Sequence, residues 1–159
     1  MLERRAWGWV IFVHSRILAA LEDDMLSQHD LSLTWLDILD RLRQSPGQRM
    51  RMNELEQASL FTRSGLTRLI DKMEQAGLVQ RERVPDDRRG IYVTITAAGH
   101  EKVSRVWPDL GTSIHEHFGR HLDQDDAHAI IRALSKVLPE GEGPLVSPPA
   151  KSDHRSSAS

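Results

Sequence analysis

The hydrophobic pattern of the chain changes its period at Gly77, and this change restricts the fold more than any other feature. Before Gly77, apolar side chains recur every three or four residues, which predicts an amphipathic helix over residues 63–76. After it, apolar and polar residues alternate over residues 78–84 and 91–96, as in half-buried strands. Between them, PDDRRG at residues 85–90 predicts a protruding turn. We therefore expect a helix, closed by a left-handed Gly77, and then a β-hairpin.

A shorter helical pattern precedes this helix. Residues 52–59 predict a short helix with Asn53 as a possible N-cap, and residues 60–62 predict a turn. Thr62 is suited to cap the next helix, because its hydroxyl can accept from backbone N–H groups. A short helix, a turn, a second helix and a hairpin is the order of a winged helix-turn-helix. The predicted fold class is mainly α with a small β-hairpin wing.

Long amphipathic helices are predicted on both sides of this lobe. They cover residues 6–28, residues 32–44 with Ser32 as N-cap, residues 97–121 with a kink or break at Pro108, and residues 123–138 with Asp123 as N-cap. The stop signal after the second of them is Ser45-Pro46-Gly47.

These patterns predict three regions. Residues 32–96 form the winged helix-turn-helix lobe, residues 6–30 and 97–138 a helical dimerisation region, and residues 139–159 a flexible tail. A lobe of roughly 65 residues does not need three further helices for its own core. We expect them to pack against each other and against a second copy, because two-fold dimers dominate soluble assemblies. The alternative is that they enlarge a monomeric core.

Composition excludes several classes of protein. The 159 residues include no cysteine, which excludes disulfides, thiolate zinc sites and cysteine redox switches. The apolar run at residues 7–13 is too short to span a bilayer and is followed by charge rather than a cleavage site, so we expect a cytoplasmic protein without membrane contact. The GxSxG, P-loop, HExxH and dinucleotide-binding patterns are absent, which predicts neither an enzyme nor a bound cofactor.

Charge is unevenly distributed along the chain. The formal net charge is −2, yet residues 41–92 hold eleven Lys or Arg against seven Asp or Glu. A basic middle segment between acidic ends suits a protein that contacts phosphate with one face.

The sequence LFTRSGLTRLIDKMEQAGLVQRERVPDDRRGIYVTITAAG, at residues 60–99, resembles the MarR family of bacterial transcription regulators. The family pattern runs from a capped helix with Ser, Thr and Arg through GLV-R to a wing with D-R-R and then V-LT--G. The similarity extends in helix order to about residues 6–138. It implies a homodimeric winged-helix regulator that binds a near-palindromic operator in double-stranded DNA and is often released by a small aromatic ligand.

The predicted recognition helix offers hydrogen-bonding groups on the face opposite its apolar stripe. Arginine can donate two bonds to guanine and threonine can contact the thymine methyl, whereas lysine and serine suit phosphate. The predicted DNA contacts of this helix are Thr62, Arg63, Ser64, Thr67, Arg68 and Lys72. The alternative is an ordinary solvated helix face.

The wing adds a second set of basic groups. The resemblance implies that Arg89 enters the minor groove and that Asp87 orients its guanidinium, with Arg88 on a phosphate. Arg81 and Arg83 alternate on the first strand and could both reach phosphates, while Gln80 and Glu82 would face the other way. The alternative is a solvated charged turn. Basic groups at both places argue against a winged-helix module that binds protein.

Two features suggest a signal input. The resemblance implies an effector pocket, for which the candidates are Trp7, Trp9, His14, Arg16 and Trp35, although these side chains could equally be packing residues. A histidine cluster on the fifth helix suggests a zinc-responsive or pH-responsive regulator as the alternative. Its members are His115, His117 and His121, and His117 and His121 share a helix face.

Overall fold

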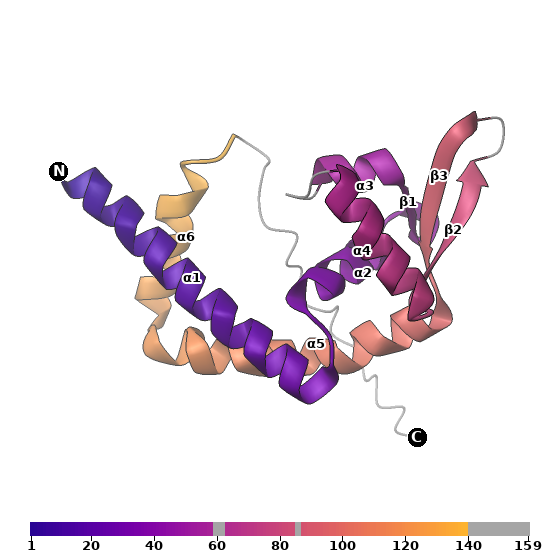
Figure 1. Cartoon of the computed structure of the whole chain (residues 1–159). Helices are drawn as coiled ribbons and strands as arrows, with labels where there is room; N and C mark the ends of the chain where they lie inside the picture. Colours follow the sequence, from indigo (N-terminus) through magenta and orange to yellow (C-terminus); the bar gives the residue numbers. More distant parts are fainter. Residues whose placement is uncertain (59–62, 85–86, 140–159) are drawn as a thin grey trace, which may run out of the picture. The chain divides into compact units, whose positions relative to one another are not determined.

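The computed structural model describes the chain apart from residues 59–62, 85–86 and 140–159 and the side chains of Arg63, Arg88 and Arg89. Contacts divide it into two units, residues 1–121 and residues 122–159. The first unit holds a helix-turn-helix lobe with a small antiparallel sheet and two long helices, and the second holds α6 (Gln124–Ser135) (Figure 1). The expected class, mainly α with a β-hairpin wing, is confirmed.

The helices follow the predicted order. In the first unit they are α1 (Leu2–His29), α2 (Leu33–Gln44), α3 (Met52–Ala58), α4 (Arg63–Gln75) and α5 (Ala97–His117), with short 3-10 turns η1 (Pro46–Gln48) and η2 (Gly119–His121). The predicted caps at Ser32 and Asp123 are confirmed: Ser32 accepts from Trp35 N, and Asp123 forms a capping box with Asp126. Gly77 has a φ of 73°, as a left-handed residue after α4 requires.

One predicted helix cap is wrong, and one predicted helix break is absent. Asn53 does not cap α3, because the helix begins one residue earlier, at Met52, and Arg51 N donates instead to Glu54 Oε2 at 2.8 Å. Of the kink or break expected at Pro108, the break is absent, because α5 runs through this residue to His117, and the kink stays a prediction. A proline removes one backbone donor, and a long helix packed along one face tolerates that loss.

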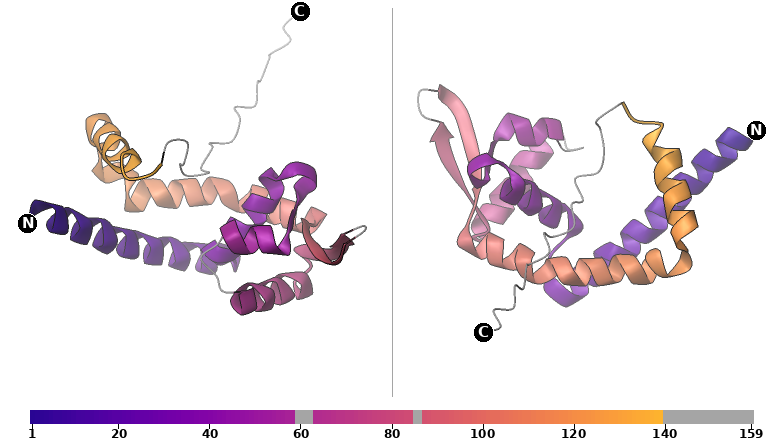
Figure 2. Two further views of the ribbon diagram at one scale, coloured as in Figure 1. Left: turned by 90° about the horizontal axis from the view of Figure 1, so that it is seen from above. Right: turned by 180° about the vertical axis from the view of Figure 1, so that it is seen from behind.

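The sheet has three antiparallel strands in the order β1-β3-β2, with bounds β1 (Arg49–Arg51), β2 (Val79–Val84) and β3 (Asp87–Ile95). β1 pairs with β3 only from Arg51↔Tyr92 to Arg49↔Thr94. The β2–β3 ladder continues to Val84↔Asp87 after a register shift. From Tyr92 back to Asp87, the wing is therefore a two-stranded ribbon of β2 and β3. This ribbon extends past the helices of the lobe (Figure 2).

One continuous core holds the lobe together. Apolar side chains of α2, α4, the sheet and α5 are fully buried in it, among them Leu39, Leu66, Ile70, Val93 and Val103. Burial of such side chains contributes about 1.5–3 kcal/mol each. The stripe of α4 that enters this core fixes which face of the helix remains in solvent.

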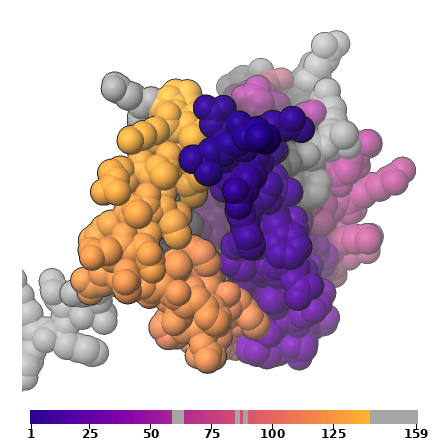
Figure 3. Space-filling view, turned by 90° about the vertical axis from the view of Figure 1, so that its left-hand side faces the viewer, coloured from indigo at the N-terminus to yellow at the C-terminus, as the bar shows by residue number. Residues whose placement is uncertain are grey.

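The C-terminal half of α1 packs beside α5 (Figures 1 and 2). Leu21 and Met25 of α1 are buried there, whereas Trp7, Trp9 and Phe12 in its N-terminal half are each more than 60% exposed. The space-filling view shows this N-terminal end of α1 in indigo (Figure 3). None of the described helices is both long and apolar enough to cross a membrane.

Candidate nucleic-acid interface

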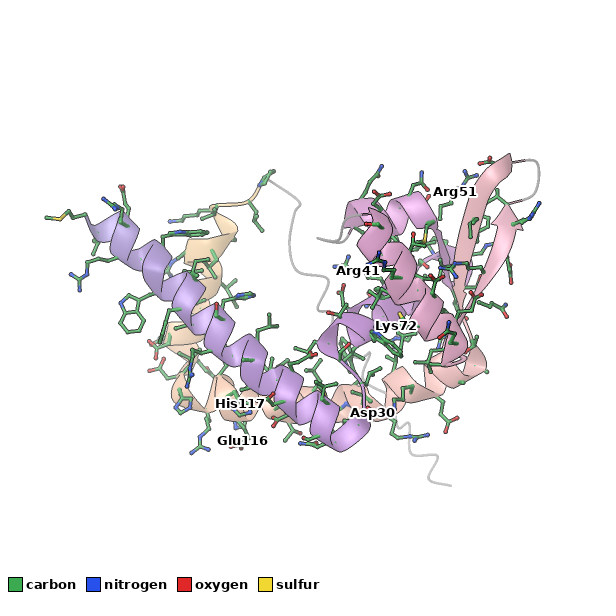
Figure 4. All side chains as sticks on the ribbon, in the orientation of Figure 1. Asp30, Arg41, Arg51, Lys72, Glu116 and His117 are labelled. Carbon is green, nitrogen blue, oxygen red and sulfur yellow. The ribbon has the colours of Figure 1, made fainter. Side chains whose placement is uncertain are left out.

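The helix α4, which the sequence predicts as the recognition helix, has two distinct faces. Leu66, Ile70 and Met73 are fully buried. The polar residues predicted to contact DNA lie on the other face and are exposed, namely Ser64, Thr67, Arg68 and Lys72. Figure 4 labels Lys72 on this helix. The three- and four-residue spacing that buries the apolar stripe therefore presents hydroxyls and cations together on one side.

Four predicted contacts lie wholly or partly outside the described residues. Thr62 is not described, and the side chains of Arg63, Arg88 and Arg89 are not placed. The backbone of Arg63 begins α4, and the backbones of Arg88 and Arg89 belong to β3. The roles predicted for these four residues therefore remain predictions.

The side chain of Arg81 pairs with carboxylates of α4, which the sequence did not indicate. Its Nη1 lies 2.7 Å from both Asp71 Oδ1 and Glu74 Oε2 of α4, and its Nη2 donates to the carbonyl of Thr67 at 3.2 Å. These contacts hold α4 against β2. Arg83, two residues further along the strand, is exposed. The phosphate contacts predicted for Arg81 and Arg83 stay predictions. Of the two side chains, Arg81 is held in described ion pairs and Arg83 is not.

Asp87 is bound at the start of β3, opposite Val84 at the end of β2. Its Oδ2 lies 3.1 Å from Arg51 Nη1 of β1, and its Oδ1 accepts from the backbone N–H of Gly90 at 3.1 Å. Gly90 permits this arrangement, since a Cβ there would approach Asp87 Oδ2 and Val84 Cγ2 to 2.7 Å. The carboxylate is thus folded over the β3 backbone.

Two arginines of β1 that the sequence did not predict lie beside Tyr92 of β3. The guanidinium carbons of Arg49 and Arg51 lie 4.4 and 5.7 Å from the ring centre of Tyr92, within cation–π range. A hydrogen bond with Tyr92 is the main cause that raises the pKa of Arg51, and the Asp87 charge adds to it. The only available signal was the alternation Arg49-Met50-Arg51, which is too short to predict a strand.

A cleft of about 520 Å³ lies between α3, α4 and the wing strands. Its polar lining includes Asn53, Thr67 and the paired arginines Arg51 and Arg81. None of the residues predicted for the effector lines it. Of those, Trp7, Trp9, His14 and Arg16 are exposed on α1, while Trp35 of α2 is half-buried against the core. The structure therefore does not gather the predicted effector residues into one described pocket.

The three predicted histidines do not lie on one helix face, because α5 ends at His117 and His121 belongs to η2. His117 Nε2 lies 2.9 Å from Asp24 Oδ2 of α1, where α5 passes beside that helix (Figure 4). Asp24 also accepts from Ser113 Oγ at 2.7 Å. The Ser113 hydrogen bond, followed by that of His117, holds the pKa of Asp24 below its ordinary value. Among the described residues, no group of three or more His, Asp or Glu side chains is placed to hold a metal ion.

Comparison with known proteins gives a consistent result. The model of the MarR family matches residues 29–90. The crystal structure of AbsC, a MarR family transcriptional regulator from Streptomyces coelicolor, is 34% identical with a TM-score of 0.77, over 86% of this chain and 91% of AbsC. A mutant of MarR from Escherichia coli, crystallised with operator DNA, is 26% identical with a TM-score of 0.72, over 86% of this chain and 96% of that one. The transcriptional regulator HosA of E. coli O111:H- is 27% identical over 109 residues, which are 69% of this chain and 78% of HosA.

Proposed function

The chain belongs to the MarR family of DNA-binding transcriptional regulators, and we propose that it binds a near-palindromic operator as a homodimer through α4 and the β2–β3 wing. The observation that carries this proposal is the exposed polar face of α4, opposite a fully buried stripe. The family consists of regulators and not of enzymes, which confirms the expectation from the sequence that the chain is not an enzyme.

The proposed mechanism follows from the geometry of α4. A helix inserted in the major groove presents the side chains near its N-terminal end to base edges. Arg68 is suited to guanine and Thr67 to the thymine methyl, while Ser64 and Lys72 are suited to phosphates. The brace from Arg81 to Asp71 and Glu74 occupies two carboxylates of the same helix, so their charge is offset next to the proposed DNA surface.

Arg68→Ala tests this assignment. We expect it to weaken operator binding by roughly 1–3 kcal/mol, because one base or phosphate contact is lost from each half-site. The operator is first selected from random double-stranded DNA with the purified wild-type protein, and affinities are then measured by fluorescence anisotropy at two salt concentrations.

Arg105→Ala is the matched control, since it removes an arginine that is 64% exposed and paired with Glu101 on α5. Equal affinities for the Arg68 variant, the Arg105 variant and the wild type would contradict the role of α4. A wild-type protein that selects no DNA sequence at all would reject the proposal as a whole.

Dimerisation is supported by apolar surface in both units. In the first unit, α1 exposes Trp7, Trp9 and Phe12. In the second, the region of α6 exposes Ile131, Leu134 and Val137. Apolar patches of this kind mark association surfaces in soluble proteins. A two-fold dimer would place two copies of α4 on successive major grooves of one operator.

A small aromatic acid is proposed as effector, and the cleft between α3, α4 and the wing is its best-supported site. Its volume of about 520 Å³ lies within the usual range for small-molecule sites. A ligand carboxylate there would compete with Asp87 for Arg51 and with Asp71 for Arg81, and so would disturb the elements that contact DNA.

Benzoate is a suitable probe of this proposal. We expect it to bind by calorimetry and to release operator DNA, and we expect Asn53→Leu, which changes the lining of the cleft, to weaken its binding. Trp9→Ala serves as the comparison, because Trp9 belongs to the effector set predicted on α1. Weaker binding in the Trp9 variant alone would move the site to α1, and release of DNA by none of a series of aromatic acids would contradict the effector proposal.

A further inference from the structure

A polar tie joins β1 to the start of β3, two strands that are distant in sequence. Arg51 of β1 contacts Asp87 of β3 at 3.1 Å across 36 positions of the chain. Asp87 in turn accepts from Gly90 N, further along β3. Figure 4 shows Arg51 between α3 and the wing strands. The tie therefore links the body of the lobe to the part of the hairpin next to its turn.

The tie begins where the three-stranded sheet ends. The last pair between β1 and β3 is Arg51↔Tyr92, and beyond it β3 pairs only with β2. A two-stranded ribbon twists and bends more freely than a wider sheet. Because Arg51 reaches past Tyr92 to Asp87, its side chain restrains the hairpin at the point where backbone pairing with β1 no longer does.

The surroundings of Asp87 are built for this contact. Gly90 leaves space for the carboxylate, because a Cβ there would lie 2.7 Å from Asp87 Oδ2. The same Cβ would also meet Val84, which is buried beside the register shift between β2 and β3. Replacing Gly90 would thus displace Asp87 without removing any charge.

We propose that Arg51 is a positioning residue for DNA binding, which holds the wing through Asp87 in the direction that the operator requires. The inference rests on the proposed function. A hairpin held in its bound direction before binding loses less conformational freedom in the complex. The side chains of Arg51 and Asp87 are 38% and 41% exposed, and such surface pairs contribute little to global stability. The effect of the pair is therefore on the wing and not on the core.

Arg51→Met and Gly90→Ala test the tie by two routes. One removes the cation and the other displaces the carboxylate while it keeps every charge. We expect each to weaken binding to the selected operator roughly tenfold, the lower part of the range for a lost DNA contact. The thermal melting temperature should be unchanged in Arg51→Met, whereas Gly90→Ala also presses on the buried Val84 and serves as the second route to displace Asp87.

Arg49→Met is the matched control for Arg51→Met. Arg49 lies on the same strand and near the same tyrosine ring, but it pairs with Glu82 at 3.8 Å. We expect its loss to weaken binding less than about threefold, through charge alone. Equal losses in the Arg49 and Arg51 variants would overturn the proposal, because charge alone would then explain both.

A double-mutant cycle separates positioning from direct phosphate contact. In an Arg89→Ala background, we expect Arg51→Met to have less than about a twofold further effect, because the wing contact that it supports is already lost. The same tenfold loss in both backgrounds would show that Arg51 contacts DNA itself, and would overturn the proposal. If the wild type bound no selected DNA, both this inference and the proposed function would fail. If the wild type bound DNA and neither Arg51→Met nor Gly90→Ala weakened the binding, this inference alone would fail.

Discussion

Asp24 is the residue at which α1 and α5 are joined by polar contacts. Its Oδ2 accepts from the buried Ser113 at 2.7 Å and lies 2.9 Å from His117 Nε2. Both partners favour the ionised carboxylate, so the pKa of Asp24 is lower in the folded chain than in the unfolded one. The unfolded chain therefore binds more protons in acid than the folded chain does. The stabilisation that Asp24 provides is complete above the ordinary aspartate pKa of about 4, and it is lost as the pH falls through the lower pKa of the folded chain.

Asp24→Asn should accordingly lower the melting temperature at pH 7, and the difference from wild type should shrink as the pH falls below about 4. Thermal melts followed by circular dichroism from pH 3 to pH 7 measure this difference. Asp23→Asn is the control, because Asp23 is an exposed neighbour on the same helix. A gap between the Asp24 variant and wild type that is as large at pH 3 as at pH 7 would show that the ionised carboxylate is not what stabilises the pair of helices.

At the scale of elements, the sequence predicts well whatever depends on local periodicity. The helices, the caps at Ser32 and Asp123 and the left-handed Gly77 follow from spacing and residue type, and all are present. The exposed side chains of α4 were predicted in the same way, since one helical stripe determines the opposite face.

Elements that depend on pairing between distant segments could not be predicted. β1 has three residues and is a strand only because β3 binds it. β3 begins at Asp87, four residues before the predicted start at residue 91, because ladder hydrogen bonds prevail over the turn-like composition of PDDRRG. For the same reason, the sequence did not show the partners of two arginines. Arg51 pairs with Asp87, which lies 36 positions further along the chain, and Arg81 of β2 pairs with Glu74 of α4.

At the scale of the whole molecule, the proposed function requires two lobes on one operator. Either lobe alone would contact one half-site, whereas linked lobes make the second contact intramolecular, which typically raises affinity by about 10²–10⁴. The apolar surfaces of α1 and of the α6 region are the described surfaces available for joining two copies. Dimerisation and tight operator binding should therefore be lost together.

Trp9→Glu combined with Ile131→Asp places charges on both surfaces, at side chains that are 64% and 66% exposed. We expect monomers by sedimentation velocity, because two charges cannot be buried unpaired in an apolar interface. Binding to the full operator should fall about hundredfold or more, to the level measured with an isolated half-site, while the melting curve of the lobe persists. Gln28→Glu adds one charge to an exposed polar position of α1 and should leave the dimer intact. A double variant that sediments as a dimer would place the interface elsewhere. A monomeric variant that binds the full operator as tightly as wild type would show that recognition does not depend on dimerisation, because a single α4 and its wing would then supply the whole affinity.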